Sequence, residues 1–219
     1  MEWDYEFDVV VVGSVNGALT AALCSHDGGA QTLVIEKSSQ FGGTSATSGG
    51  GVWIPNNRYA KAENVDDSDQ DARNYINSVS PEGMIKDELI ETYISEGPRM
   101  IDYLHENSQV KYRNLAHYPD YFPDNTGGKE GNRSMEPEPI FGTELGDDLG
   151  KLREQHPQTA FTMGPINMNF TQVEGQLLLG ALPGWKTQFA KLFTKYILDF
   201  TMRFKWGWKD RRLTMGNAG

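Results

Sequence analysis

The chain contains little cysteine, and this limits both its cross-links and its metal chemistry. Among 219 residues Cys24 is the single cysteine, so neither an intramolecular disulfide nor a cluster of thiolate ligands is available. Because Cys24 lies within an apolar helical segment, we expect a small core residue there. A protein without disulfides suits a reducing compartment, and the expected location is cytoplasmic.

Positive charge is also scarce. The sequence has 20 Lys and Arg against 30 Asp and Glu, which gives a formal net charge of −10. Nucleic-acid binding depends on clustered positive charge, so we expect no nucleic-acid partner.

Long apolar runs and metal-ligand spacings are missing as well. No run of about eighteen apolar residues occurs, which excludes an ordinary transmembrane helix, and the first eight residues do not have the pattern of a secretory signal. The four histidines stand singly at positions 26, 105, 117 and 156. Because no two of them have the spacing of metal ligands, we expect no metal site.

The sequence begins with a strand, helix and strand pattern. The β-branched run over residues 7–12 is typical of a strand buried on both faces of a parallel sheet, and Gly13 ends it. Apolar residues at helical spacing over residues 19–23 follow, and Gly28 closes that helix before a second apolar run at residues 32–35. We therefore predict a β-α-β unit.

The turn of this unit is close to a dinucleotide-binding fingerprint. Gly13 and Ala18 occupy the first and third positions of G-x-G-x-x-G/A, and Glu36 follows the second strand, 23 residues after Gly13. Such an acid accepts hydrogen bonds from ribose hydroxyls, while the helix N-terminus attracts the pyrophosphate. The alternative is a β-α-β unit without a ligand, in which Glu36 is merely solvated.

Val15 stands where the fingerprint has its middle glycine. That glycine lets the backbone approach the pyrophosphate, and a branched side chain fills the same space. If the backbone of Val15 had a positive φ, strain of about 1–3 kcal/mol would be added. We expect the fold to survive and the affinity for the cofactor to fall.

A segment rich in glycine, serine and threonine follows, "KSSQFGGTSATSGGGVWIPNN" over residues 37–57. Its backbone can pass close to a ligand while its amides and hydroxyls donate hydrogen bonds. Phe41 and Trp53 argue against a solvated linker. The predicted cofactor-binding residues are Gly13, Ser14, Val15, Gly17, Ala18, Glu36, Lys37, Gly42, Gly43, Thr44, Ser45, Ser48, Gly49, Gly50 and Gly51.

These motifs resemble a known family. The nucleotide turn with "FGGTSATSGGGVWIPNN", then "SEGPRMIDYLHEN", "YPDYFPD" and "DRRLTMGNAG", is similar to the 3-ketosteroid Δ1-dehydrogenases (3-oxosteroid 1-dehydrogenases). That branch belongs to the flavoprotein superfamily of fumarate reductases and succinate dehydrogenases. The resemblance covers essentially the whole chain.

The resemblance implies an FAD-dependent 1,2-desaturation of the A ring of 3-ketosteroids, with an external electron acceptor. A tyrosinate removes a proton from C2 while a hydride leaves C1 for the flavin. In the family, one tyrosine of the "PDYF" segment hydrogen-bonds to the base tyrosine, and Tyr121 matches it. Taken without the resemblance, Tyr121 is an aromatic residue packing in a loop bounded by prolines.

The resemblance also implies an architecture. We expect an α/β fold with a Rossmann-like FAD-binding β-α-β unit and an incomplete sheet, then a mainly helical and irregular substrate-side segment. Residues 1–118 would form the N-terminal part of the FAD-binding domain, and residues 119–219 the start of the substrate or cap region. Because the base tyrosine and later strands of the family's sheet come from beyond position 219, we expect an N-terminal portion of the enzyme that is inactive alone.

Two other readings stay open. One is a noncatalytic remnant that folds and associates with a membrane or a partner. The other is an NAD-dependent enzyme, which the glycine-rich second segment disfavours because that segment is typical of FAD proteins of this superfamily.

The remaining segments give coarser predictions. Ser68 is expected to cap a helix that ends near Val79, and Pro81 to start another that Pro98 interrupts or restarts. Residues 120–150 are expected either to run over the surface or to begin a substrate-side domain. An amphipathic helix near residues 185–205 either packs over the substrate cleft or makes peripheral contact with a membrane.

Overall fold

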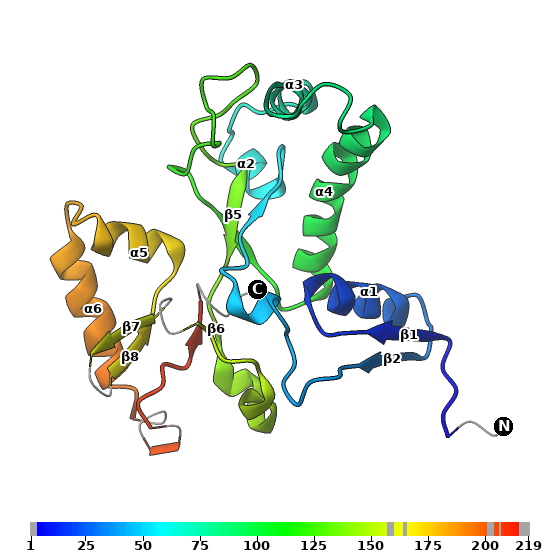
Figure 1. Ribbon diagram of the computed structural model, residues 1–219. Helices are drawn as coiled ribbons and strands as arrows, with labels where there is room; N and C mark the ends of the chain where they lie inside the picture. Colours follow the sequence, from blue (N-terminus) through cyan, green and yellow to red (C-terminus); the bar gives the residue numbers. More distant parts are fainter. Residues whose placement is uncertain (1–3, 157–159, 164–165, 201–203, 206, 215–219) are drawn as a thin grey trace. The chain divides into compact units, whose positions relative to one another are not determined.

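The structure is a computed structural model that describes residues 4–156, 160–163, 166–200, 204–205 and 207–214 (Figure 1). It divides into two compact units: the first comprises the described parts of residues 1–50 and 139–219, and the second comprises residues 51–138. Helices and small sheets alternate along the chain, which confirms the predicted α/β class. The predicted functional boundary between residues 118 and 119 stays a prediction.

The first unit opens with the predicted β-α-β motif. Strand β1 (Val9–Val12) pairs in parallel with β2 (Thr32–Ile35), and the register runs from Val9 opposite Thr32 to Val12 opposite Ile35. Helix α1 (Asn16–Asp27) connects them and lies beside the pair in Figure 1. Gly28 caps this helix, and its amide donates to the carbonyl of Cys24 at 3.0 Å. The sequence pattern therefore predicted the motif correctly.

The prediction that β1 is buried on both faces is wrong for this chain. Val10 and Val12 are 51% and 77% exposed, whereas Val9 and Val11 on the other face are half-buried. In the described residues the sheet has only two strands, so each strand has an open edge and one face stays exposed. Cys24 is exposed too, and none of the residues of α1 is buried, so the expectation of a core cysteine is also wrong.

The later part of the first unit contains two small sheets. Strand β6 (Ile140–Phe141) pairs antiparallel with β9 (Arg212–Leu213), and β7 (Ala160–Met163) pairs antiparallel with β8 (Ile166–Asn169). A 3₁₀ segment, η2 (Gly142–Lys151), follows β6. A parallel bridge between Phe41 and Leu152 joins this part to the glycine-rich loop.

Two helices complete the first unit. Helix α5 (Gln172–Leu179) has a capping box, in which Thr171 and Glu174 bond to each other's backbone amides. Helix α6 (Trp185–Ile197) buries Leu192 and Tyr196 in a cluster with Met168 of β8. This packing accounts for the apolar stripe of the predicted amphipathic helix.

The predicted helix near residues 185–205 is shorter than expected. It ends at Ile197, where Leu198 forms the C-cap. Residues 201–203 and 206 lie outside the described residues. In the part of the chain that the structure describes, no helix is both long and apolar enough to cross a membrane.

The second unit combines three helices with a three-stranded antiparallel sheet. The helices are α2 (Arg58–Ala62), α3 (Asp69–Val79) and α4 (Asp87–Asn107). The strands are β3 (Val52–Trp53), β4 (Tyr112–Asn114) and β5 (Ser134–Pro137), in the order β3-β5-β4. Its core has two clusters. One contains Ile54, Ile101 and Met135, and the other contains Ala72, Ile90 and Ile94.

The helix predictions for the second unit succeed only in part. Ser68 caps α3 as expected, because its hydroxyl accepts the amide of Asp71 at 3.1 Å. Helix α4, however, does not begin near Pro81. Gly83, with φ +71°, stands between Pro81 and the helix, and a left-handed backbone cannot continue a right-handed helix. Pro98 lies inside α4 and does not end it.

The surface path predicted for residues 120–150 is wrong in its middle. Strand β5 is the central strand of the sheet, and Met135 and Glu136 are buried. Arg133, just before β5, is only 1% exposed. Proline, glycine and acidic residues predict loops from local propensity alone, and here long-range packing overrides that preference.

Candidate functional site

Three segments of the first unit meet at the side chain of Ser14. This serine is 4% exposed, and its hydroxyl donates to Glu36 Oε2 at 2.6 Å. The hydroxyl oxygen of Ser14 in turn accepts the amide of Gly42 at 2.8 Å. Gly13, with φ +96°, turns the chain out of β1, and its amide donates to the carbonyl of Ile35 at 2.7 Å. The β1–α1 turn, the end of β2 and the glycine-rich loop are thereby joined into one site.

Glu36 is held in its ionised form at this site. The hydrogen bond from the Ser14 hydroxyl, followed by that from the Ser38 amide at 3.0 Å, lowers the pKa of Glu36 below its ordinary value. An ionised carboxylate only accepts hydrogen bonds. Glu36 is therefore suited to accept them from the hydroxyl groups of a ligand.

Val15 has an ordinary backbone conformation. Its φ of −79° and ψ of 168° are extended and place it at the N-cap of α1, so the strain expected from a positive φ does not arise. Its side chain is packed against the glycine-rich loop instead. A Cβ on Gly43, which has φ +51°, would lie 2.7 Å from Val15 Cγ1. Position 43 therefore requires glycine for two reasons: its backbone is left-handed, and a side chain would collide with Val15.

The first turn of α1 offers free space and donors. A Cβ at Gly13 or Gly17 would meet nothing within 4 Å. The amide of Asn16 donates to Ser45 Oγ at 3.2 Å, while Val15 supplies no side-chain cap. The amides of Gly17 and Ala18, like those at the start of any helix, have no acceptor within the helix. A partly positive helix end beside open space suits an anionic group such as a pyrophosphate.

The glycine-rich loop folds tightly around a 3₁₀ turn, η1 (Ser45–Thr47). Gly42 is buried with φ +97°, and a Cβ there would lie 2.5 Å from that of Ala46, so a side chain does not fit. Ser48 Oγ accepts the amide of Gly50 at 3.1 Å and donates to the carbonyl of Ser45 at 2.8 Å. The loop therefore has a defined shape rather than that of a linker.

The predicted cofactor residues are distributed unevenly around this site. Contacts join Gly13, Ser14, Val15, Glu36, Gly42, Gly43 and Ser45 to one another or to their neighbouring segments. Gly17 and Ala18 lie in the first turn of α1, and Lys37, Thr44, Ser48, Gly49 and Gly50 lie along the loop. Gly51 falls in the second unit. The contact of each residue with a cofactor stays a prediction.

The second unit contains an aromatic cavity of about 300 Å³. Tyr121 lines it with a side chain that is 83% exposed. Its neighbours in the chain are tied down, because the Phe122 amide donates to the Tyr75 hydroxyl at 3.3 Å and the Asp120 amide to the Lys129 carbonyl at 2.9 Å. The other lining residues are Trp53, Tyr75, Ile76, Val79, Tyr118, Pro119, Asp120, Phe122 and Ser134.

Sequence reasoning missed a buried ionic cluster beside this cavity. Arg133 pairs with Asp67 Oδ1 at 2.7 Å and with Asp120 Oδ2 at 2.9 Å, and all three side chains are at most 4% exposed. Its guanidinium carbon lies 5.4 Å from the centre of the Trp53 ring. The partners are 66 and 13 residues away from Arg133 in the chain, so no local spacing signals the cluster.

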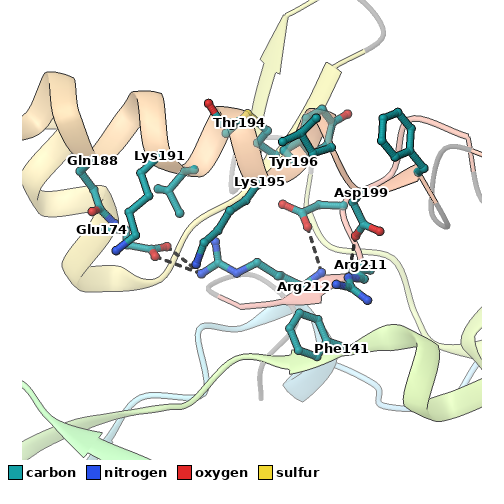
Figure 2. A pocket seen from close by; sticks show the side chains of 15 residues that line it. Phe141, Glu174, Gln188, Lys191, Thr194, Lys195, Tyr196, Asp199, Arg211 and Arg212 are labelled. Atoms are coloured by element: carbon teal, nitrogen blue, oxygen red, sulfur yellow. Dashed lines mark hydrogen bonds and ion pairs between the residues drawn. The ribbon is translucent and has the colours of Figure 1, made fainter.

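Figure 2 shows a larger cavity in the first unit, of about 690 Å³, between α6 and the end of the described chain. Arg212 pairs with Glu174 at 2.9 Å, and Arg211 pairs with Asp199 at 2.6 Å. Phe141 lies under Arg211, whose guanidinium carbon is 4.4 Å from the ring centre. None of the predicted site residues lines this cavity. Among the described residues, no group of three or more His, Cys, Asp or Glu could hold a metal ion.

Comparison with known proteins agrees with this geometry. Residues 8–190 match the FAD binding domain family, so the chain belongs to that family of flavoproteins. Its cofactor is FAD, and the Ser14–Glu36 junction, the open first turn of α1 and the shaped loop fit a dinucleotide of that kind.

Individual relatives indicate a more specific group within this family. The 3-oxosteroid 1-dehydrogenase of Mycolicibacterium smegmatis is 37% identical over 168 residues, which are 77% of this chain and 29% of that enzyme. The 4-oxocyclohexanecarboxylate 2-dehydrogenase of Sinomonas cyclohexanicum is 37% identical over 157 residues, or 72% of this chain and 27% of that enzyme.

A solved structure covers more of the chain. The crystal structure of 3-ketosteroid delta1-dehydrogenase from Sterolibacterium denitrificans in complex with 1,4-androstadiene-3,17-dione matches with a TM-score of 0.89 and 38% identity. The match covers 97% of this chain and 37% of that protein. The resemblance to the 3-ketosteroid dehydrogenases is therefore confirmed, and the chain spans less than two fifths of the length of these relatives.

Proposed function

We propose that the chain is the FAD-binding part of a dehydrogenase that introduces a double bond between C1 and C2 of a 3-ketosteroid. The observation that carries this proposal is the match along 97% of the chain to a dehydrogenase holding a steroid dione. The Ser14–Glu36–Gly42 junction supports the proposal, because it joins the three segments that would hold the cofactor.

Each part of the first unit has a proposed role toward FAD. Glu36 would accept hydrogen bonds from the ribose hydroxyls, and the amides of Gly17 and Ala18 would donate to the pyrophosphate. The glycine-rich loop, from Gly42 to Gly50, would follow the cofactor toward its flavin ring. When bound, FAD supplies an acceptor for a hydride, and an external acceptor must later remove the electrons.

Tyr121 has a proposed role in proton removal. Its hydroxyl is exposed on a loop whose backbone is held on both sides, so it is available to a partner at a fixed position. A hydrogen bond donated to a tyrosinate lowers the pKa of that tyrosine. Tyr121 would in this way help a second tyrosine to act as the base that the resemblance implies.

Two substrate classes are compatible with the relatives, a 3-ketosteroid and a small cyclic ketone bearing a carboxylate. The cavity beside Tyr121 favours the steroid. Its walls are mostly aromatic or aliphatic, and among the described residues that line it there is an acid, Asp120, and no lysine, arginine or histidine. A carboxylate bound there would have no cationic partner, whereas a steroid ring would bury apolar surface.

Binding experiments separate these substrates. The purified chain, loaded with FAD, should bind 1,4-androstadiene-3,17-dione in equilibrium dialysis, and a large excess of 4-oxocyclohexanecarboxylate should not displace it. Displacement by the carboxylate at comparable concentration would favour the small ketone.

For the 219 residues alone, we propose FAD binding without steroid turnover, because the chain spans only 29% of the Mycolicibacterium smegmatis enzyme. Measurable desaturation of a 3-ketosteroid by the isolated chain would refute this. The alternative is a noncatalytic remnant that associates with a membrane or a partner, and a chain that binds anionic vesicles in flotation but never retains flavin would support it. Peripheral membrane contact and a cytoplasmic location remain part of the proposal.

A further inference from the structure

The loop that carries Tyr121 is fixed by one buried carboxylate. Asp120 accepts the indole N–H of Trp53 on Oδ1 at 2.6 Å. Its Oδ2 accepts from Arg133 Nη1 at 2.9 Å and from the Lys129 amide at 3.0 Å. Three donors from three segments of the second unit therefore converge on the residue directly before Tyr121.

Arg133 is the charged partner of this carboxylate. Its guanidinium is divided between Asp120 and Asp67, and the amides of Asn56 and Ser68 also donate to Asp67, at 2.8 and 2.9 Å. These buried charges are thus paired and hydrogen-bonded on several sides, the condition under which a buried charge is tolerated.

The same cluster shapes the cavity. The Arg133 guanidinium lies against the rings of Trp53 and Tyr75, at 5.4 and 5.7 Å from their centres, and both rings line the cavity together with Tyr121. The Tyr75 hydroxyl in turn accepts the Phe122 amide. The walls of the cavity and both chain neighbours of Tyr121 are therefore connected through Arg133 and Asp120.

We infer that Asp120, held by Arg133, is a positioning residue that fixes the place of Tyr121 and the orientation of Trp53 toward a ligand in the cavity. The inference rests on the proposed function for the catalytic use of Tyr121. Such a cluster contributes geometry more than stability, because buried ion pairs replace well-packed apolar contacts at little net gain. Small displacements of a reacting group are costly for catalysis, so a fixed loop has a functional value.

The positioning role is tested by the mobility of residue 121. In a Cys24→Ser background, which removes the native thiol, Tyr121→Cys accepts a nitroxide spin label whose line shape reports motion of the loop. Asp120→Asn keeps the shape of the side chain and removes its charge. Asp124→Asn, an exposed acid of the same loop, is the matched control.

We expect the label in Asp120→Asn to give a narrower, more mobile spectrum than in the parent, and the label in Asp124→Asn to match the parent. Trp53→Phe, which removes the indole donor and keeps a smaller aromatic wall, should shift the spectrum in the same direction. Circular dichroism confirms that each variant is folded. Identical spectra for folded Asp120→Asn, Trp53→Phe and Asp124→Asn would overturn the inference.

Ligand binding separates this inference from the proposed function. With Tyr121 present, Asp120→Asn should weaken binding of 1,4-androstadiene-3,17-dione roughly tenfold, about the effect of losing one hydrogen bond to a charged group, while Asp124→Asn leaves it unchanged. If the parent chain binds no steroid, the proposed substrate is wrong, and the spin-label comparison still decides whether Asp120 positions residue 121.

Discussion

The hydroxyl of Ser14 donates to Glu36 across 22 residues of sequence, at 2.6 Å, and accepts the amide of Gly42 in a third segment. A small polar side chain thereby connects the nucleotide turn, the acid after β2 and the glycine-rich loop. Because these bonds exist within the chain itself, the proposed FAD site is organised without help from the cofactor. Preorganisation of this kind lowers the cost of binding.

Replacing Ser14 by alanine should raise the pKa of Glu36 toward its ordinary value, because the hydroxyl is the largest cause of the lowered pKa. A depressed carboxyl pKa stabilises the folded chain above the unfolded-state pKa, and that contribution is lost as pH falls through the folded-state pKa. The measurement is an NMR titration of the Glu36 carboxyl carbon. Ser25→Ala, which removes only a bond within α1, is the control, and an equal shift in both variants would contradict the account.

The size of residue 15 should set the affinity for FAD. Val15 has an unstrained backbone, so its cost to cofactor binding is steric alone. We expect the FAD dissociation constant to fall in the order Val, Ala, Gly at this position, measured by quenching of flavin fluorescence. A Val15→Gly variant that binds FAD no better than the parent would show that the valine does not obstruct the cofactor.

Gly43→Ala should destabilise the chain through two separable effects. A left-handed backbone costs a non-glycine residue about 1–2 kcal/mol, and the new Cβ would meet Val15 Cγ1 at 2.7 Å. In a Val15→Gly background only the first cost should remain, so urea unfolding of the double variant should show a smaller loss. Gly150→Ala, in open space and without a positive φ, is the control, and additive losses at positions 15 and 43 would contradict the contact.

Removing the charge of Arg133 should strongly lower the free energy of unfolding. Arg133→Met leaves Asp67 and Asp120 buried and unpaired, and such a loss typically costs about 3–5 kcal/mol of unfolding free energy. Arg58→Met removes the half-exposed pairs with Asp102 and Glu106, which are worth about 0–1 kcal/mol. Chemical denaturation followed by circular dichroism compares the two, and similar losses would mean that Asp67 and Asp120 are not left as unpaired buried charges in Arg133→Met.

Local sequence patterns predicted the features that depend on near neighbours. The β-branched run before Gly13, the spacing to Glu36 and the Ser68 cap all specify short-range geometry, and the structure contains each of them. The prediction that Val10 and Val12 are buried was wrong, because burial depends on neighbouring strands and not on the strand's own residues.

Features built from distant segments were beyond such patterns. Arg133 lies in a stretch whose composition indicates a loop, yet its partners come from elsewhere in the second unit and bury it. The packing of Val15 on Gly43 likewise joins two segments that are each ordinary by themselves. Both features can be recognised only once the fold has brought the distant segments together.

The most direct test of the central claim is the visible absorbance of the purified chain after incubation with excess FAD and removal of free cofactor, beside Val15→Gly and Glu36→Ala. The account predicts a retained and perturbed flavin band in the parent, a stronger band in Val15→Gly and a weaker one in Glu36→Ala. A spectrum without bound flavin in both the parent and Val15→Gly would contradict it.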